Sequence, residues 1–220
     1  MHITLRDIKN SDEIRTYITQ ADASLKALGY TEHSFAHVGK CADVAARILT
    51  ELGYSHREIE LAKIAAYMHD IGNVINRVDH AQSGAVMAFR ILDKMGMAPA
   101  DVAVVITAIG NHDEHTAFPV NAVAAALILA DKTDVRRSRV RNSDVTNFDI
   151  HDRVNYAVEQ SDVTLDAAGK VIKLVLTINT EVCAVMDYFE IFLQRMLLCR
   201  KAAEALGLHF HLEINGQILL

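Results

Sequence analysis

Residues 11–140 place apolar side chains at helical spacing, in segments separated by polar capping residues and glycines. Ser55-His56-Arg57-Glu58 has the form of a capping box and opens a segment that is apolar on one face. Pro99 suits the first position of a helix, and Pro119 is a possible start of another. We expect consecutive helices over about residues 11–29, 34–53, 55–70, 80–95, 99–110 and 119–131.

The pattern changes after residue 143. Residues 144–152 are polar and are expected to form a connector, whereas residues 171–178 alternate strictly and predict a strand that pairs with residues 154–165. A long helix is expected over residues 180–206, then a strand over 208–214 and a short hairpin at Asn215-Gly216. The sequence thus predicts a mainly α protein. A helical bundle (1–145) precedes a small C-terminal ββαβ unit (146–220), expected to be an antiparallel sheet with one helix on its apolar face.

Composition limits the classes of partner and the compartment that we expect for this chain. The 220 residues are 51% hydrophobic with a formal net charge of −6, which offers no general attraction for nucleic acid. The three cysteines are far apart in apolar segments and indicate free thiols in a reducing compartment. The N-terminus lacks the apolar core of a signal peptide, and the longest apolar run, residues 122–130, is too short to span a bilayer. We expect a cytoplasmic protein with no membrane partner.

The candidate chemistry centres on the dipeptide His69-Asp70, with His37 before it and Asp131 after it. An HD dipeptide often only caps a helix, His33 competes with His37, and an acid such as Asp131 can simply end a helix. Here, however, the dipeptide follows an apolar helix that must be buried. Burying a carboxylate beside an imidazole costs several kcal/mol of folding free energy unless the carboxylate is paired or binds a metal.

The spacing H…HD…D resembles the HD-domain superfamily of metal-dependent phosphohydrolases, over about residues 33–141. Adding His80 and His112 gives H…HD…H…H…D, which is typical of members with two metals. The resemblance implies these metal ligands: His37, His69, Asp70, His80, His112 and Asp131. His80 could instead be an exposed cap and His112 a residue favoured by the helix dipole, and His115 is a weaker candidate.

The cofactors implied are one or two divalent ions among Fe, Mn, Co, Ni and Zn, with Asp70 as a bridge. Asp70, His80 and Lys132 are the candidate catalytic residues, and hydrolysis by a metal-activated hydroxide is the expected mechanism. Residues 108–131 look most like the bacterial branch that cleaves diadenosine tetraphosphate symmetrically. The Gly-Tyr-Pro signature of the cyclic-di-GMP branch is missing, and Asn73 stands where a lysine often follows the HD pair.

Five cations lie within residues 132–141 of this acidic chain. They could form a solvated helix face. Alternatively, Arg136 and Arg137 could bind the phosphates of a substrate, because arginine grips two phosphate oxygens at once.

Two functions remain open. The first is a phosphohydrolase acting on a small phosphorylated substrate, in particular a nucleotide, and the second is a regulatory module that senses a nucleotide with little or no hydrolysis. A merely structural metal site is a weaker third. The retained set of His37, His69, Asp70 and Asp131 favours the enzyme. For the C-terminal unit, three roles are open: a homodimer interface, a cover for the site, or an effector-binding surface.

Overall fold

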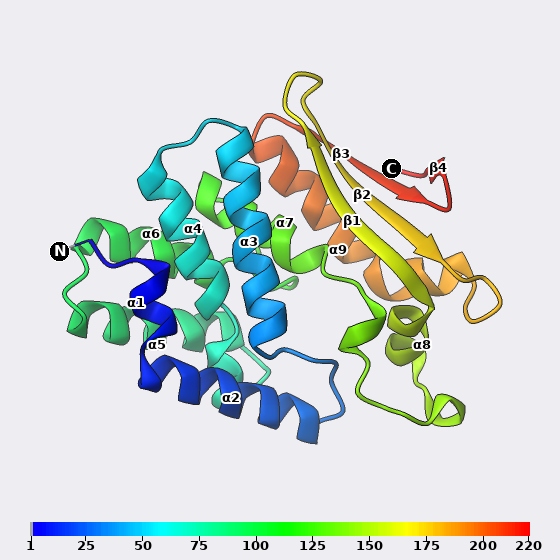
Figure 1. Ribbon diagram of the computed structural model, residues 1–220, viewed down its shortest axis with the longest axis horizontal. Helices are drawn as coiled ribbons and strands as arrows, with labels where there is room; N and C mark the ends of the chain where they lie inside the picture. Colours follow the sequence, from blue (N-terminus) through cyan, green and yellow to red (C-terminus); the bar gives the residue numbers. More distant parts are fainter. Residues whose placement is uncertain (1) are drawn as a thin grey trace.

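The computed structural model describes residues 2–220, and Met1 lies outside the described residues. A helical bundle is followed by a small sheet, as the sequence predicts (Figure 1). The bundle consists of α1 (Leu5–Lys9), α2 (Asp12–Ala27), α3 (Phe35–Glu51), α4 (His56–Met68), the 3-10 turn η1 (Ile71–Val74), α5 (His80–Lys94), α6 (Pro99–Gly110) and α7 (Ala122–Lys132).

Local capping sets the helix starts. The predicted capping box at Ser55 and Glu58 is confirmed, and Pro99 occupies the first turn of α6. Pro119 does not open α7: the helix begins at Ala122, because the side chain of Asn121 accepts a hydrogen bond from the Ala124 amide at 2.8 Å. The short helix α1 was not predicted, and a capping box between Thr4 and Asp7 forms it.

Helix α7 joins the two parts of the molecule. Its residues from Val123 to Ala130 are all buried, which marks it as a central helix. Ala124 and Leu127 belong to the core of the bundle, whereas Ile128 and Leu129 pack into a second core under the sheet. The bundle and the C-terminal unit therefore share a continuous apolar interior.

The C-terminal unit consists of α8 (Ile150–Ala157), β1 (Val158–Asp166), β2 (Val171–Ile178), α9 (Val185–Ala205), β3 (His209–Ile214) and β4 (Gln217–Ile218). Two expectations need correction here. Residues 150–157 form a helix instead of the end of a connector and the start of a strand, because the Asp149 side chain caps α8 through the Asp152 amide. The long helix begins at Val185 and not at Thr180, after a turn.

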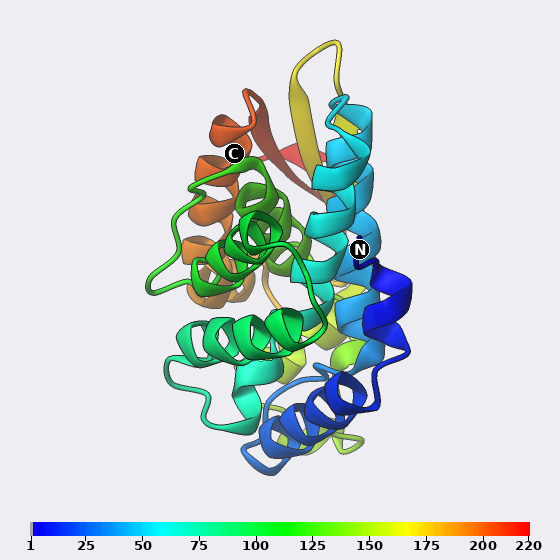
Figure 2. The ribbon, with the colours of Figure 1, turned by 90° about the vertical axis from the view of Figure 1, so that its left-hand side faces the viewer.

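The sheet has the order β1-β2-β3-β4 and is mixed, not antiparallel as expected. β1 and β2 form the predicted antiparallel hairpin, but β2 and β3 run parallel because α9 crosses between them. The face that carries Ile172, Leu174 and Leu212 packs on α9. Figure 1 shows α9 (orange) behind the sheet, and Figure 2 shows it beside the green helices of the bundle. Within residues 2–220, no helix has the length and apolar character needed to cross a membrane.

Candidate metal centre and cavity

The HD pair lies where α4 ends, with His69 as the C-cap of the helix and Asp70 directly before η1. This turn sits very close to the start of α5. A Cβ atom on Gly72 would lie 2.0 Å from the His80 carbonyl oxygen and 2.5 Å from the Gly84 amide nitrogen. Only glycine fits at this position, and its bare backbone brings Asp70 next to the first residue of α5, His80.

Each predicted imidazole ligand is fixed through its Nδ1 atom. The N–H groups of His69, His112 and His80 donate to the carbonyls of Ala66 (2.7 Å), Ile109 (2.6 Å) and Arg77 (3.0 Å). His37 donates to the Asp134 carboxylate at 2.7 Å. The Nε2 atom of each ring is thereby left as an acceptor at the site, which is how metal-binding histidines are normally oriented.

Asp70 stands between two groups of ligands. Its Oδ2 atom lies 3.1 Å from His69 Nε2 and 3.6 Å from His37 Nε2, whereas its Oδ1 atom lies 3.7 Å from His80 Nε2. Asp131 Oδ1 lies 3.4 Å from His37 Nε2 and 3.7 Å from His69 Nε2. His37, His69, Asp70 and Asp131 thus surround one position, and Asp70, His80 and His112 surround its neighbour.

Two observations show that this donor set fits a divalent cation. His69 Nε2 and Asp70 Oδ2 are buried and have no hydrogen-bond partner among residues 2–220, which is costly for such atoms. His80 Nε2 and His112 Nε2 lie 3.1 Å apart, although both rings already donate through Nδ1 and so direct lone pairs at each other. A cation between the donors resolves both conflicts. The set suits Fe, Mn, Co, Ni or Zn.

The electrostatics of the site also favour positive charge. Burial opposes a charged imidazole at His69, but the carboxylates of Asp70 and Asp131 outweigh it and raise the pKa of His69 to about 10. Burial likewise opposes an ionised Asp70, yet His69 holds the pKa of that carboxyl well below its usual value. Burial lowers the pKa of His112, with help from His69 and Lys132, so that its ring is neutral.

Two residues support the predicted ligands in roles that the sequence did not predict. Asp134 is buried, accepts from His37, and is balanced by Lys40 at 3.0 Å and Arg136 at 2.9 Å. The side-chain amide of Asn73 donates to Asp70 Oδ1 at 2.9 Å and so orients it. The sequence places Asp134 three residues after Asp131, but it does not show that Asp134 pairs with His37, which lies 97 positions earlier.

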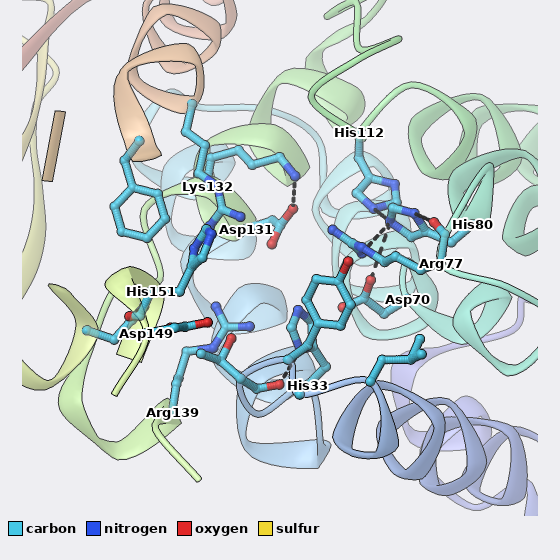
Figure 3. A pocket seen from close by; sticks show the side chains of 17 residues that line it. His33, Asp70, Arg77, His80, His112, Asp131, Lys132, Arg139, Asp149 and His151 are labelled. Carbon is cyan, nitrogen blue, oxygen red and sulfur yellow. Dashed lines mark hydrogen bonds and ion pairs between the residues drawn. The ribbon is translucent and has the colours of Figure 1, made fainter. Parts of the chain in front are cut away.

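A cavity of about 310 Å³ opens beside the metal ligands (Figure 3). Asp70, His80, His112 and Asp131 form one of its walls. Four cationic side chains also line it: Arg77, Lys132, Arg139 and Arg195. Helices α8 and α9 contribute His151, Asn155, Phe192 and Arg195 to the lining, and Asp149, the N-cap of α8, also lines the cavity. The C-terminal unit therefore covers the site.

The remaining candidates lie as follows. Lys132 is buried at the cavity, with its Nζ 2.7 Å from Asp131 Oδ2, and His33 lines the cavity beside His37. His115 is exposed and is not part of the lining.

Arg136 and Arg137 lie away from the cavity lining. Arg136 contacts Asp134 and Glu32, and Arg137 donates to the Tyr156 carbonyl at 2.6 Å. The structure thus brings together the six predicted ligands and Lys132, but not this arginine pair.

Residues 34–137 match the HD domain family. The chain is also similar to the crystal structure of a predicted HD superfamily hydrolase from an uncultured Thermotogales bacterium, with 24% sequence identity and a TM-score of 0.43, over 61% of this chain and 75% of that one. No curated protein matches the chain. The six predicted ligands all lie inside the matched segment, whereas α8, α9 and the sheet lie beyond it.

Proposed function

We propose that this chain, whose residues 34–137 match the HD domain family, is a metal-dependent phosphohydrolase that acts on a small, nucleotide-like phosphorylated substrate. The observation that carries this proposal is that Asp70 lies in one cluster with five other N and O donor side chains, at the wall of a cavity lined by cations. His37, His69, Asp70 and Asp131 would hold one ion, and Asp70, His80 and His112 a second. Divalent ions there would activate water and polarise a phosphoryl group.

The side chains of the cavity supply the remaining chemistry. Although the whole chain is acidic, Arg77, Lys132, Arg139 and Arg195 present positive charge to a bound anion. Lys132 is the candidate for stabilising charge that develops on the phosphoryl oxygens, because its buried ammonium lies at the cavity wall, held by Asp131. Asn73 and Asp134 keep Asp70 and His37 in place. The phosphate-binding role predicted for Arg136 and Arg137 is not part of this proposal, because neither side chain lines the cavity.

The test combines metal analysis with a substrate panel. Protein prepared without chelator should contain one or two transition-metal ions per chain by elemental analysis. With Mn or Fe added, it should hydrolyse at least one member of a panel of nucleoside mono-, di- and triphosphates, dinucleoside polyphosphates and cyclic dinucleotides, as measured by chromatography of the products. Protein that binds no metal, or that is fully metal-loaded but inactive on the entire panel, would contradict the enzyme assignment.

A sensing module is the second candidate, favoured by one observation: α8 and α9, beyond the family segment, line the same cavity. A nucleotide bound there would contact the C-terminal unit directly. Tight nucleotide binding by the metal-loaded protein, measured by calorimetry and without turnover, would select this alternative.

A further inference from the structure

The cavity has two chemically different halves. The HD segment supplies the metal-ligand wall with Lys132, and α8 and α9 supply a wall that no part of the matched family segment covers. Since the two walls come from different parts of the chain, the residues that select the substrate need not belong to the metal site. Figure 3 shows Asp149 and His151 across the cavity from His80 and His112.

Arg195 is the cation that α9 contributes. Its Nε atom lies 2.5 Å from Glu114 Oε1, and its guanidinium carbon lies 4.6 Å from the centre of the Phe192 ring. Glu114 also faces Lys132 at 3.6 Å, which ties α9 to the metal wall. The two terminal nitrogens of Arg195 have no hydrogen-bond or ion-pair partner among residues 2–220, so that this fixed guanidinium has donors left for an anion.

The α8 side of the cavity has the opposite character. Asp149 caps α8 with one carboxylate oxygen, at 2.7 Å from the Asp152 amide, which leaves the other oxygen as an acceptor. His151 is exposed, whereas Asn155 is buried and anchored by a hydrogen bond from its amide to the His151 carbonyl. A carboxylate at this wall repels phosphate but accepts hydrogen bonds from hydroxyl groups. The two ends of a substrate must therefore differ, with phosphate near Arg195 and hydroxyls near Asp149.

The size of the cavity limits the substrate further. A volume of about 310 Å³ has room for roughly ten water molecules and lies at the small end of ligand sites. One phosphoryl group and a sugar-sized carrier fit such a space. A dinucleoside polyphosphate, with two nucleosides and several phosphates, would extend beyond it.

We propose that residues 146–220 form the substrate-recognition half of the site and that the substrate is a compact phosphomonoester with a hydroxyl-bearing carrier, such as a pentose phosphate or a nucleoside monophosphate. Arg195 binds the phosphoryl oxygens, and Asp149 binds hydroxyl groups of the carrier. This inference rests on the proposed phosphohydrolase function and names its substrate class.

The experiment compares two variants with matched controls in the full-length, metal-loaded protein. Arg195→Gln removes the charge, and Arg200→Gln is its control on an exposed position of the same helix. Asp149→Ser removes the carboxylate but keeps a side-chain oxygen that can cap α8. Its control is Asp144→Ser, which makes the same change at the exposed cap of the turn at Val145–Asn147. The probes are ribose 5-phosphate, adenosine 5′-monophosphate, diadenosine tetraphosphate, p-nitrophenyl phosphate and inorganic phosphate.

Arg195→Gln should weaken binding of inorganic phosphate, measured by calorimetry, and lower kcat/KM for every monoester, by about ten- to a hundredfold in each case. Asp149→Ser should lower kcat/KM for the two hydroxyl-bearing monoesters by about tenfold and leave p-nitrophenyl phosphate unchanged. Both controls should behave as wild type, with metal content and Tm unchanged in all variants.

Unchanged phosphate affinity in Arg195→Gln, or equal losses on all monoesters in Asp149→Ser, would overturn the inference. So would a preference of the wild type for diadenosine tetraphosphate. These results leave the phosphohydrolase proposal intact as long as p-nitrophenyl phosphate is hydrolysed. If nothing is hydrolysed, the proposed function fails, and the calorimetric affinities for ribose 5-phosphate and inorganic phosphate still decide the recognition roles of Asp149 and Arg195.

Discussion

Each predicted ligand side chain at the candidate metal centre is held by a partner that fixes its direction. Three rings donate to the backbone carbonyl three residues earlier in the chain, and His37 donates to the distant Asp134. Asp70 differs from the other ligands because its two oxygens face different groups of histidines. Loss of Asp70 therefore damages both positions, whereas loss of a single histidine damages one.

Asp70→Ala should abolish hydrolysis and most metal binding, whereas His80→Ala should mainly weaken the second ion, because His80 contacts only the Oδ1 side of Asp70. Elemental analysis after gel filtration measures both effects. Asp93→Ala, on an exposed position of α5, is the control. Equal metal content in wild type and Asp70→Ala would rule out the bridging role.

Variants of Arg136 and Arg137 can distinguish a phosphate-binding role of this pair from a structural role. Arg136 balances the buried Asp134, and Arg137 lies 4.5 Å from the Tyr156 ring centre. We expect the double change Arg136→Ala/Arg137→Ala to lower Tm and to reduce activity equally on a nucleoside triphosphate and on p-nitrophenyl phosphate. A KM raised about ten- to a hundredfold for the triphosphate alone would instead assign phosphate binding to this pair.

The grouping of the predicted ligands could be expected from the sequence more readily than the residues around them. A predicted ligand such as Asp70 is recognisable because an acid at the end of a buried apolar helix needs a partner. The roles of Arg77, Arg195 and Asp134 could not be predicted in this way, since they depend on which distant elements the fold brings together. The volume of the cavity and the charge of its far wall are equally tertiary properties.

At the scale of elements, the contact between η1 and α5 decides the geometry. The two segments approach so closely that backbone meets backbone at Gly72 and Gly84. The helices themselves were predictable from caps such as Ser55, which act locally. The predicted start of α7 was wrong because Pro119 and the cap Asn121, two residues later, give competing local signals. The parallel pairing of β2 and β3 was not predicted because it depends on where α9 packs.

Gly72→Ala should be strongly destabilising, because its Cβ would lie 2.0 Å from the His80 carbonyl oxygen and push α5 away from the HD turn. Overpacking of this kind costs about 1–3 kcal/mol, and the shift of His80 should also weaken metal binding. Denaturant unfolding and metal titration measure the two effects. Gly39→Ala, within α3 and with open space at its Cβ, should be neutral or slightly stabilising. Equal stabilities of the two variants would refute the close-packing argument.

At the scale of the whole molecule, α7 serves two cores and α8 and α9 cover the cavity. The expected division between residues 145 and 146 separates the metal ligands from the wall opposite them. It also leaves one face of α7 without its cover, because Ala125, Ile128 and Leu129 pack into the core under the sheet. The two parts are thus distinct in architecture but share their packing.

This sharing leads to a prediction for a fragment that ends at residue 145. The fragment retains every predicted metal ligand, yet it exposes the face of α7 formed by Ala125, Ile128 and Leu129, each fully buried in the complete chain. Burial of a Leu or Ile side chain contributes about 1.5–3 kcal/mol, so that losing this interface removes much of a typical domain's stability. We expect the fragment to aggregate or to melt without a cooperative transition, as measured by light scattering and circular dichroism, with the full chain as the control. A monomeric fragment that melts cooperatively and binds metal like the full chain would show instead that residues 1–145 fold independently and that the C-terminal unit serves recognition alone.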